Sequence, residues 1–263
     1  MATDVPETNV ILRTDGPVAT IELARPARLN ALTLAMLGQL DAICAGLEAR
    51  TDVRVVVVRS SSARAFCAGA DVNEWSALGP EGMWRRWIAE GHRVFDRLAH
   101  LPMPTVASIS GVAFGGGLEL ALTCDLRLAS PDARFALPET RIGVVPGWGG
   151  TARLAALIGT GRAKQMALTG EPVGAEEACR WGMVNEMVEL TALPARVQAV
   201  AMRIAEGPRL AVQVTKQLID GSLPRGPTAA LEALAAGFVA GSDDLAEGVT
   251  AFREKRPPRF RRD

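Results

Sequence analysis

Four consecutive valines, Val55 to Val58, constrain the fold of this chain more than any other feature of its sequence. They lie in a run of residues 53–59 that predicts a β-strand buried on both faces, because four valines follow one another with no polar residue between them. Buried strands of this kind are typical of sheets that are covered by helices. The run therefore favours an α/β fold.

Strand and helix signals alternate along most of the chain, which supports the same fold class. A turn signal at Asp15-Gly16-Pro17 separates two short strands, and Thr33 is a candidate N-cap for the first helix. Strand signals stop after about Leu193, so we expect a core of residues 1–192 and a helical region of residues 193–263. The predicted strands are 9–13, 18–23, 53–59, 105–109 and 125–129, and the predicted helices are 33–50, 81–101, 115–123, 196–204, 210–219, 228–238 and 243–254.

The composition of the chain indicates which kinds of partner and which cellular location to expect. The chain has 29 basic and 29 acidic residues, and this balance argues against non-specific binding to nucleic acid. The N-terminal residues do not resemble a signal peptide, and no segment has the ~18–20 uninterrupted apolar residues of a membrane helix. The four cysteines are scattered and form no C-x-x-C pair, so we expect reduced thiols, no metal site and a cytoplasmic protein.

A glycine-rich segment, Gly115 to Gly117, follows the predicted strand 105–109 and begins a helix. Glycine lets a ligand approach the backbone closely, and the first N–H groups of a helix have no partner within it. Such a segment can stabilise a developing negative charge. Glu119 follows between two leucines, where a buried carboxylate is costly unless it is paired or used. The alternative is that the glycines only allow tight packing and that Glu119 lies on the surface.

Two further segments could contribute to a site. Residues 66–71 follow the valine run and are mostly small, so they could expose backbone donors or form a plain connection. Glu139 lies 20 residues after Glu119, in the segment 138–151. A fold that brings the two carboxylates together would supply an acid/base pair, and otherwise Glu139 is a solvated loop residue.

The order and spacing of these segments resemble the enoyl-CoA hydratase/isomerase (crotonase) superfamily. The similarity covers nearly the whole chain, and the ordered set is specific although each segment alone is not. The matching segments are RPARLNAL (25–32), FCAGAD (66–71), GVAFGGGLELALTCD (111–125), PETRIGVVPGWGGT (138–151), LTG (168–170), AEEACRWGMVN (175–185) and FREKRP (252–257).

The resemblance implies a crotonase-like β-β-α spiral core and a helical C-terminal region that forms a homotrimer or a dimer of trimers. It implies an acyl-CoA substrate whose thioester oxygen is bound by an oxyanion hole, the backbone N–H groups of Ala70 and Gly116. Glu119 is then expected to activate a water molecule and Glu139 to supply a proton to Cα. No metal or other cofactor is implied, because coenzyme A is part of the substrate, and neither nucleic acid nor a membrane is an expected partner.

The resemblance also suggests how the substrate is bound. Arg28 and Leu29 resemble the segment that meets the CoA moiety, and the carbonyl group of Ala68 is expected to receive the adenine amine. The acyl pocket is expected near residues 71–87, beginning at Asp71, and we hypothesise that a tryptophan there limits acyl length. The candidates are Trp75, Trp84 and Trp87.

Both glutamates are present, which favours an enoyl-CoA hydratase. A Δ3,Δ2-enoyl-CoA isomerase usually needs only one acid/base carboxylate, and it is the main alternative, together with other acyl-CoA reactions of the same superfamily. A non-enzymatic RNA-binding relative is a further alternative, against which the zero net charge and the intact pair of glutamates argue.

Overall fold

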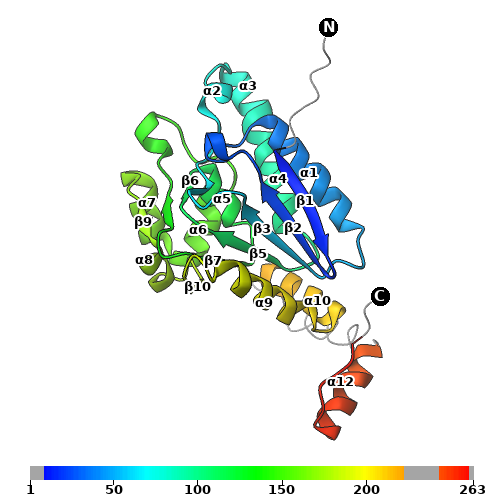
Figure 1. Ribbon diagram of the computed structural model, residues 1–263. Coiled ribbons are helices and arrows are strands. Elements are labelled where there is room, and N and C mark those ends of the chain that lie inside the picture. Colours follow the sequence, from blue (N-terminus) through cyan, green and yellow to red (C-terminus); the bar gives the residue numbers. More distant parts are fainter. Residues whose placement is uncertain (1–8, 222–242, 261–263) are drawn as a thin grey trace.

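The computed structural model of the chain describes residues 9–221 and 243–260. Two β-sheets lie at its centre, and helices cover them (Figure 1). The larger sheet has six strands, of which β1 and β2 are antiparallel and the later neighbours are parallel. Its order is β1 (Val10–Asp15), β2 (Val18–Leu23), β3 (Val55–Ser60), β5 (Thr105–Ile109), β7 (Leu126–Ala129) and β10 (Glu186–Met187).

The four valines lie in β3, at the middle of this sheet, and their side chains alternate between two hydrophobic clusters. Val56 and Val58 belong to the main core, whereas Val55 and Val57 belong to a second cluster beneath α9 (Leu193–Ala205). Helix α9 packs across β2, β3, β5 and β7. Burial on both faces explains why the run contains no polar alternation.

A second sheet of four strands follows the first. Strands β3, β5 and β7 of the larger sheet are each followed by a strand of the smaller sheet and then by helix, so the chain winds as a β-β-α spiral. The β-β-α spiral that the resemblance implied is therefore confirmed. The order of the smaller sheet is β4 (Ala65–Cys67), β6 (Val112–Phe114), β8 (Arg134–Ala136) and β9 (Val173–Gly174), and the first three strands are parallel.

Helices cover both sheets, and α1 and α4 pack against each other over the main core. Thr33 caps α1 as expected, because its side chain accepts a hydrogen bond from Met36 N–H. Besides α9, the helical elements are η1 (Pro26–Arg28), α1 (Leu34–Glu48), α2 (Val72–Trp75), α3 (Pro80–Gly82), the π-helix η2 (Met83–Ile88), α4 (Ala89–Ala99), α5 (Gly116–Ala121), η3 (Glu139–Ile142), α6 (Gly150–Ile158), α7 (Thr160–Thr169), α8 (Ala175–Arg180), α10 (Arg209–Gly221) and α12 (Asp243–Glu254).

The predicted strands all correspond to strands of the larger sheet: 18–23 and 105–109 agree at both ends, and the ends of the others shift by up to two residues. The segment predicted as one helix, 81–101, instead forms α3, η2 and α4 in succession. The predicted helix 228–238 lies outside the described residues. The division between residues 192 and 193 stays a prediction.

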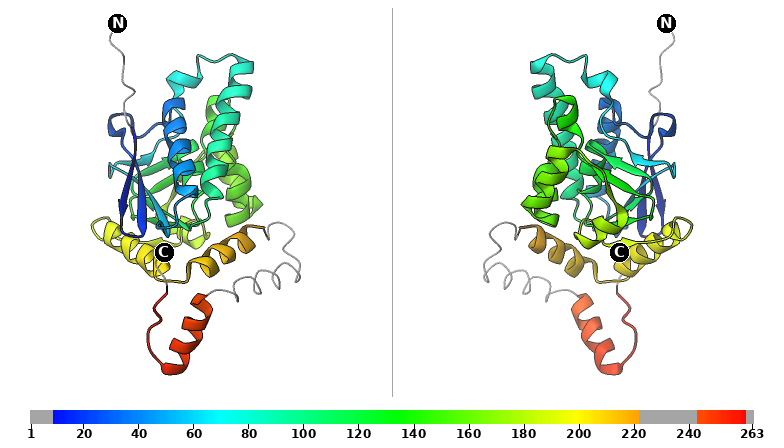
Figure 2. Two further views of the ribbon diagram at one scale, coloured as in Figure 1. Left: turned by 90° about the vertical axis from the view of Figure 1, so that its right-hand side faces the viewer. Right: turned by 90° about the vertical axis from the view of Figure 1, so that its left-hand side faces the viewer.

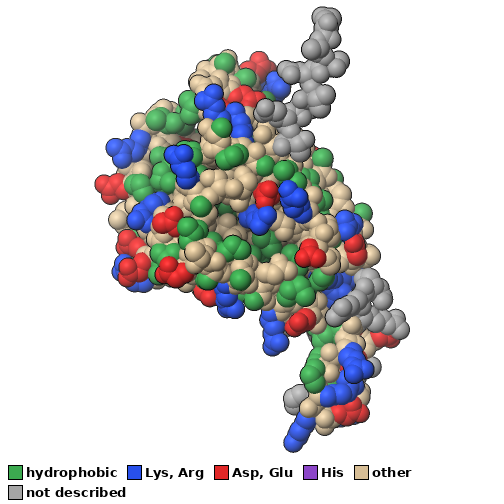
Figure 3. Space-filling model, in the orientation of Figure 1, with side chains coloured by type: hydrophobic (Ala, Val, Ile, Leu, Met, Phe, Trp, Pro, Cys, Tyr) green, Lys and Arg blue, Asp and Glu red, His purple; other side chains and the backbone are tan. Residues whose placement is uncertain are grey.

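The C-terminal helices lie along one side of the molecule. Helices α9 and α10 run beside the sheets, and α12 extends beyond them in every view (Figures 1 and 2). On the face drawn in Figure 3, basic and acidic side chains are interspersed. Within the described ranges, no helix is both long and apolar enough to cross a membrane.

Candidate active site

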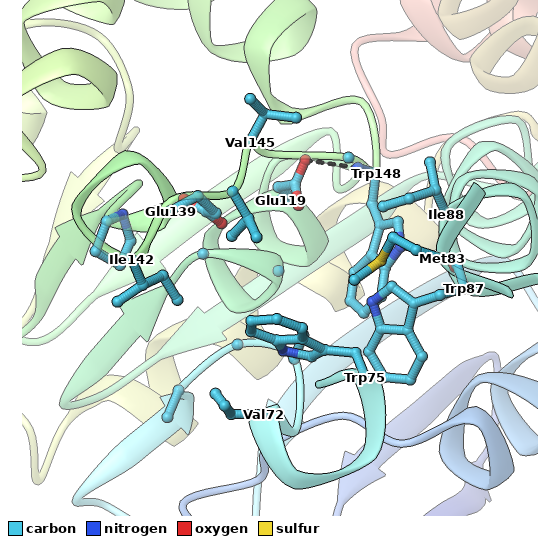
Figure 4. Close-up of a pocket in the computed structure, with 18 residues that line it drawn as sticks. Val72, Trp75, Met83, Trp87, Ile88, Glu119, Glu139, Ile142, Val145 and Trp148 are labelled. Carbon is cyan, nitrogen blue, oxygen red and sulfur yellow. Dashed lines mark hydrogen bonds between the residues drawn. The ribbon is translucent and has the colours of Figure 1, made fainter. Parts of the chain in front are cut away.

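One cavity lies where three parallel strands of the smaller sheet end. Residues that directly follow β4, β6 and β8 line it, because the carboxyl ends of parallel strands meet at one edge of a sheet. Residues of η2 and of the segment 144–148 complete the wall, and the cavity volume is about 130 Å³ (Figure 4). The lining residues are Ala68, Gly69, Ala70, Val72, Trp75, Met83, Trp87, Ile88, Gly115, Gly116, Glu119, Pro138, Glu139, Ile142, Val144, Val145, Gly147 and Trp148.

Glu119 lies in α5 and is buried, with 2% of its surface exposed. Its Oε1 atom accepts hydrogen bonds from the backbone N–H groups of Trp148 and Gly150, both at 2.8 Å. Burial is the largest effect and holds the pKa of Glu119 above its usual value, although these two donors and the Arg153 guanidinium act to lower it. Because N–H donors bond more strongly to a carboxylate than to a carboxylic acid, they favour the ionised form.

Glu139 is the first residue of η3, which begins shortly after β8. Its Oε2 atom is buried and has no hydrogen-bond partner within the described part of the chain. Burial raises the pKa of Glu139 to about 7; a backbone hydrogen bond at Glu139 itself lowers it, and the nearby charge of Glu119 raises it further. A buried oxygen without a partner favours the protonated form and is uncommon outside functional sites.

The two carboxylates therefore face one cavity from different environments (Figure 4). Glu119 receives two backbone donors, and Glu139 has an oxygen that receives none. Burial raises the pKa of both groups, but only Glu119 receives backbone donors that favour its ionised form, so Glu119 is the better base and Glu139 the better acid. The two titrations are linked, because the charge of Glu119 raises the pKa of Glu139.

Two backbone N–H groups lie beside the carboxylates. A Cβ atom built at Gly116 would lie 3.5 Å from the Ala70 nitrogen, so the two segments are in close contact. Among the described residues, neither Ala70 N–H nor Gly116 N–H donates a hydrogen bond. Gly116 is the first residue of α5, where no acceptor exists within the helix. Both donors are thus free to bind an oxygen atom in the cavity.

Glycine is required at the start of α5 for two separate reasons. Gly115 has a φ of 51°, which side-chain-bearing residues rarely adopt, and a Cβ there would approach Glu139 Oε1 to 2.7 Å. At Gly117 a Cβ would lie 2.1 Å from the carbonyl oxygen of Cys67. The glycines therefore serve both alternatives considered from the sequence, since they allow tight packing and also border the cavity.

The segment that carries Ala70 is fixed by the loop before α1. Leu32 N–H donates to the Gly69 carbonyl at 2.7 Å, and Asp71 N–H donates to the Leu32 carbonyl at 2.8 Å. The Asp71 carboxylate lies 2.7 Å from the Arg25 guanidinium, whose hydrogen bond lowers the pKa of Asp71. These contacts hold the Ala70 N–H group in position.

The structure brings together most of the residues that the sequence singled out. Ala68, Ala70, Gly116, Glu119 and Glu139 all line the cavity. Asp71 does not, because its side chain is paired with Arg25 and caps α2 through Asn73 N–H. Arg28 is exposed and Leu29 is half-buried, and both lie in or next to η1, outside the cavity lining.

Of the three tryptophans that were candidates for limiting acyl length, two line the cavity and one does not. Trp75 and Trp87 line the cavity, whereas Trp84 is 67% exposed and its ring lies against the Arg85 guanidinium. Sequence reasoning missed Trp148 and Gly150, the donors to Glu119. The glycines on both sides of Trp148 were the available signal, because they indicate a backbone in close contact with another group.

Comparisons with known proteins agree with this arrangement. The family model described as Enoyl-CoA hydratase/isomerase matches residues 13–263. The chain is 38% identical to the short-chain-enoyl-CoA hydratase of Clostridium acetobutylicum over 251 residues, which is 94% of this chain and 95% of that protein. It is 36% identical to the (E)-benzylidenesuccinyl-CoA hydratase of Thauera aromatica, with 96% of this chain and 98% of the relative covered. The crystal structure of an enoyl-CoA hydratase from Bacillus anthracis superimposes with a TM-score of 0.92 at 34% identity, over 97% of this chain and all of that one (100%).

Proposed function

The chain belongs to the enoyl-CoA hydratase/isomerase family, and we propose that it is an enoyl-CoA hydratase that works through Glu119 and Glu139. The reaction is the reversible addition of water across the 2,3 double bond of an enoyl-CoA thioester. The observation that carries the proposal is the pair of carboxylates in opposite environments beside two free backbone donors.

The thioester carbonyl binds with its oxygen between Ala70 N–H and Gly116 N–H. These donors stabilise the negative charge that develops on the oxygen as water adds to Cβ. Backbone donors fixed by the contacts around Gly69 and Leu32 need no reorganisation during the reaction. The rest of the CoA moiety extends along the loop of Arg28, Leu29 and Ala68, as the family resemblance suggests.

Glu119 is the base and Glu139 the acid. Glu119 removes a proton from a bound water, whose oxygen forms a bond to Cβ while the π electrons move toward the carbonyl oxygen. Glu139 then donates its proton to Cα, and the two carboxylates return to their starting states by proton exchange through water. The two N–H donors on Glu119 and the pKa of about 7 for Glu139 support this division of roles.

The mechanism uses no metal and no redox cofactor, because backbone amides stabilise the charge and carboxylates move both protons. An isomerase would need one carboxylate to carry a proton between two carbon atoms, and the second would then have no role. We also propose a cytoplasmic location, because the scattered cysteines are typical of reduced thiols, and assembly as a homotrimer or a dimer of trimers, on the strength of the family resemblance.

The test is a hydration assay with crotonyl-CoA. The reaction is monitored through the loss of absorbance of the conjugated thioester. We expect rapid loss with the wild-type protein and at least ~100-fold slower turnover with Glu119→Gln and with Glu139→Gln, because each removes one proton carrier. Both variants should still bind butyryl-CoA, since glutamine keeps the size of the side chain and its oxygen can accept the same N–H groups.

Near-normal turnover by either glutamine variant would rule out the two-carboxylate mechanism. A wild-type protein that leaves crotonyl-CoA intact but shifts a double bond from the 3,4 to the 2,3 position would be an isomerase. Glu171→Gln is the matched control, because Glu171 is an exposed glutamate outside the cavity and should leave turnover unchanged.

A further inference from the structure

The inner end of the cavity is closed by aromatic side chains. Trp87 and Trp148 line the cavity, and each is almost fully buried. Their ring centroids lie 5.6 Å apart, and the fully buried Phe95 ring meets Trp148 edge-on at 5.1 Å. The Trp87 and Trp148 side chains lie close together at the cavity (Figure 4), and all three rings belong to the main hydrophobic core.

The Trp148 indole is held from three sides. Its Nε1–H group donates to the Trp87 carbonyl oxygen at 3.3 Å. A Cβ built at Gly91, on α4, would lie 2.2 Å from this Nε1 atom, and one built at Gly116 would lie 2.5 Å from Cζ3 of the ring. The indole therefore packs directly on two glycine backbones and cannot turn aside without clashing.

The π-helix η2 supplies the neighbouring wall. Met83, Trp87 and Ile88 of this element line the cavity, whereas Trp84 of the same element faces solvent. A π-helix has a wider turn than an α-helix and occurs frequently at functional sites. Here it directs three apolar side chains toward the end of the cavity that Trp148 closes.

The position of the reacting carbons relates this wall to the substrate. Glu119 marks the place where water is added to Cβ, and the same Trp148 whose backbone N–H holds Glu119 presents its ring to the cavity. Carbon atoms beyond Cβ therefore meet the indole soon after they pass the carboxylates. The cavity of about 130 Å³ is also small, since an apolar cavity of about 150 Å³ admits one benzene molecule.

We infer that Trp148, with Trp87 and Met83, limits the substrate to short enoyl-CoA esters of about crotonyl size. The inference rests on the proposed function, because it names the acyl class that the same site accepts. Trp148 acts here as a determinant of specificity through its ring, in addition to the hydrogen bond that its backbone makes to Glu119.

The first experiment compares kcat/KM of the wild-type protein for crotonyl-CoA and for trans-2-decenoyl-CoA. We expect the longer ester to be at least ~10-fold poorer, because even one methylene that does not fit an apolar pocket changes kcat/KM by about 10–200-fold. Binding of butyryl-CoA and decanoyl-CoA, measured by calorimetry, should show the same preference without any turnover.

The second experiment enlarges the pocket with Trp148→Leu and, separately, Met83→Ala. We expect the ratio of kcat/KM for decenoyl-CoA to that for crotonyl-CoA to rise ~10-fold or more in the first variant and less in the second. The ratio is the informative quantity, because damage to Glu119 or to stability lowers kcat/KM for both esters by the same factor. Such damage therefore leaves the ratio unchanged. Met83 is only half-buried, so its variant keeps the test available if Trp148→Leu does not fold. Trp84→Leu is the matched control and should leave the ratio unchanged.

Each outcome has a separate meaning. Equal kcat/KM for the two esters in the wild-type protein, or an unchanged ratio in the folded pocket variants, would overturn the acyl limit and leave the hydratase function standing. If the protein hydrates no enoyl-CoA ester of any length, the proposed function itself would be wrong. A rise in the ratio with Trp84→Leu equal to that with Trp148→Leu would also contradict the role of the pocket wall.

Discussion

The buried Oε2 atom of Glu139 makes the stability of the protein depend on pH. Desolvation raises the pKa of Glu139 to about 7 in the folded protein, whereas a glutamate in an unfolded chain has a pKa of about 4.3. Below about pH 4 the group is neutral in both states and carries no penalty. As pH rises through about 7 the folded protein must ionise a buried group, and stability is lost over that interval.

Glu139→Gln should therefore stabilise the protein at alkaline pH while it slows turnover. We expect the midpoint of thermal unfolding, Tm, to rise by about 2–4 °C near pH 8.5 and to change little near pH 4, because a neutral amide avoids the cost of the buried charge. Differential scanning calorimetry at the two pH values measures this directly.

The exposed Glu171 provides the control, and Glu171→Gln should leave Tm unchanged at both pH values. A Tm for Glu139→Gln that lies below that of the wild-type protein near pH 8.5 would mean that the ionised carboxylate is stabilised in the folded state. In that case Glu139 would be a poor proton donor at neutral pH.

At the scale of single residues, the sequence predicted the two glutamates but not the backbone N–H groups that donate hydrogen bonds to Glu119. Glu119 and Glu139 occur in recognisable segments, and an apolar flank around a carboxylate is visible in the sequence itself. Trp148 and Gly150 lie about 30 residues from Glu119, and their N–H groups reach it only through the fold. A hydrogen bond between a carboxylate and backbone N–H groups far along the chain leaves little trace in local composition.

The start of α5 is the element on which the proposed oxyanion hole depends. Gly117 packs its backbone directly against the end of β4, where a Cβ would lie 2.1 Å from the Cys67 carbonyl oxygen. Neither partner is a flexible side chain, so a methyl group there must move the helix away from the sheet. That movement would also displace Gly116 N–H from Ala70.

Gly117→Ala should thus lower the free energy of unfolding by about 1–3 kcal/mol, the range of overpacked core substitutions. Gly38→Ala is the matched control, because Gly38 is an exposed residue inside α1 with no atom near a built Cβ. It should raise the free energy of unfolding by about 0.5–1 kcal/mol through helix propensity. Urea denaturation of the two variants measures both values, and equal effects would contradict the packing of α5.

Elements were predictable from the sequence where they are long and buried. The strands of the larger sheet were predicted because runs such as Val55–Val58 have a strong apolar signal. Strands β4, β6 and β8 have three residues each and were missed, since their pairing with one another defines them. The π-helix η2 was missed because its apolar spacing differs little from that of an α-helix over six residues.

At the scale of the whole molecule, α12 is an element that keeps apolar side chains exposed within the described part of the chain. It extends beyond α9 and α10 and exposes Leu245 and Val249, which are four residues apart and so share a face. A helix with such a face usually buries it against another element. The homotrimer or dimer of trimers proposed above would supply that element from a second copy of the chain.

Leu245→Glu combined with Val249→Glu should therefore reduce the molar mass in solution, because two carboxylates on that face oppose its burial. We expect light scattering to give a multiple of three times 27.8 kDa for the wild-type protein and a lower mass for the double variant. Ala42→Glu, at an exposed position of α1, should keep the wild-type mass. A double variant that keeps the wild-type mass would mean that α12 lies outside the interface. A monomeric wild-type protein would instead contradict the assembly itself, and in that case α12 would have to bury its apolar face against its own chain or leave it exposed to solvent.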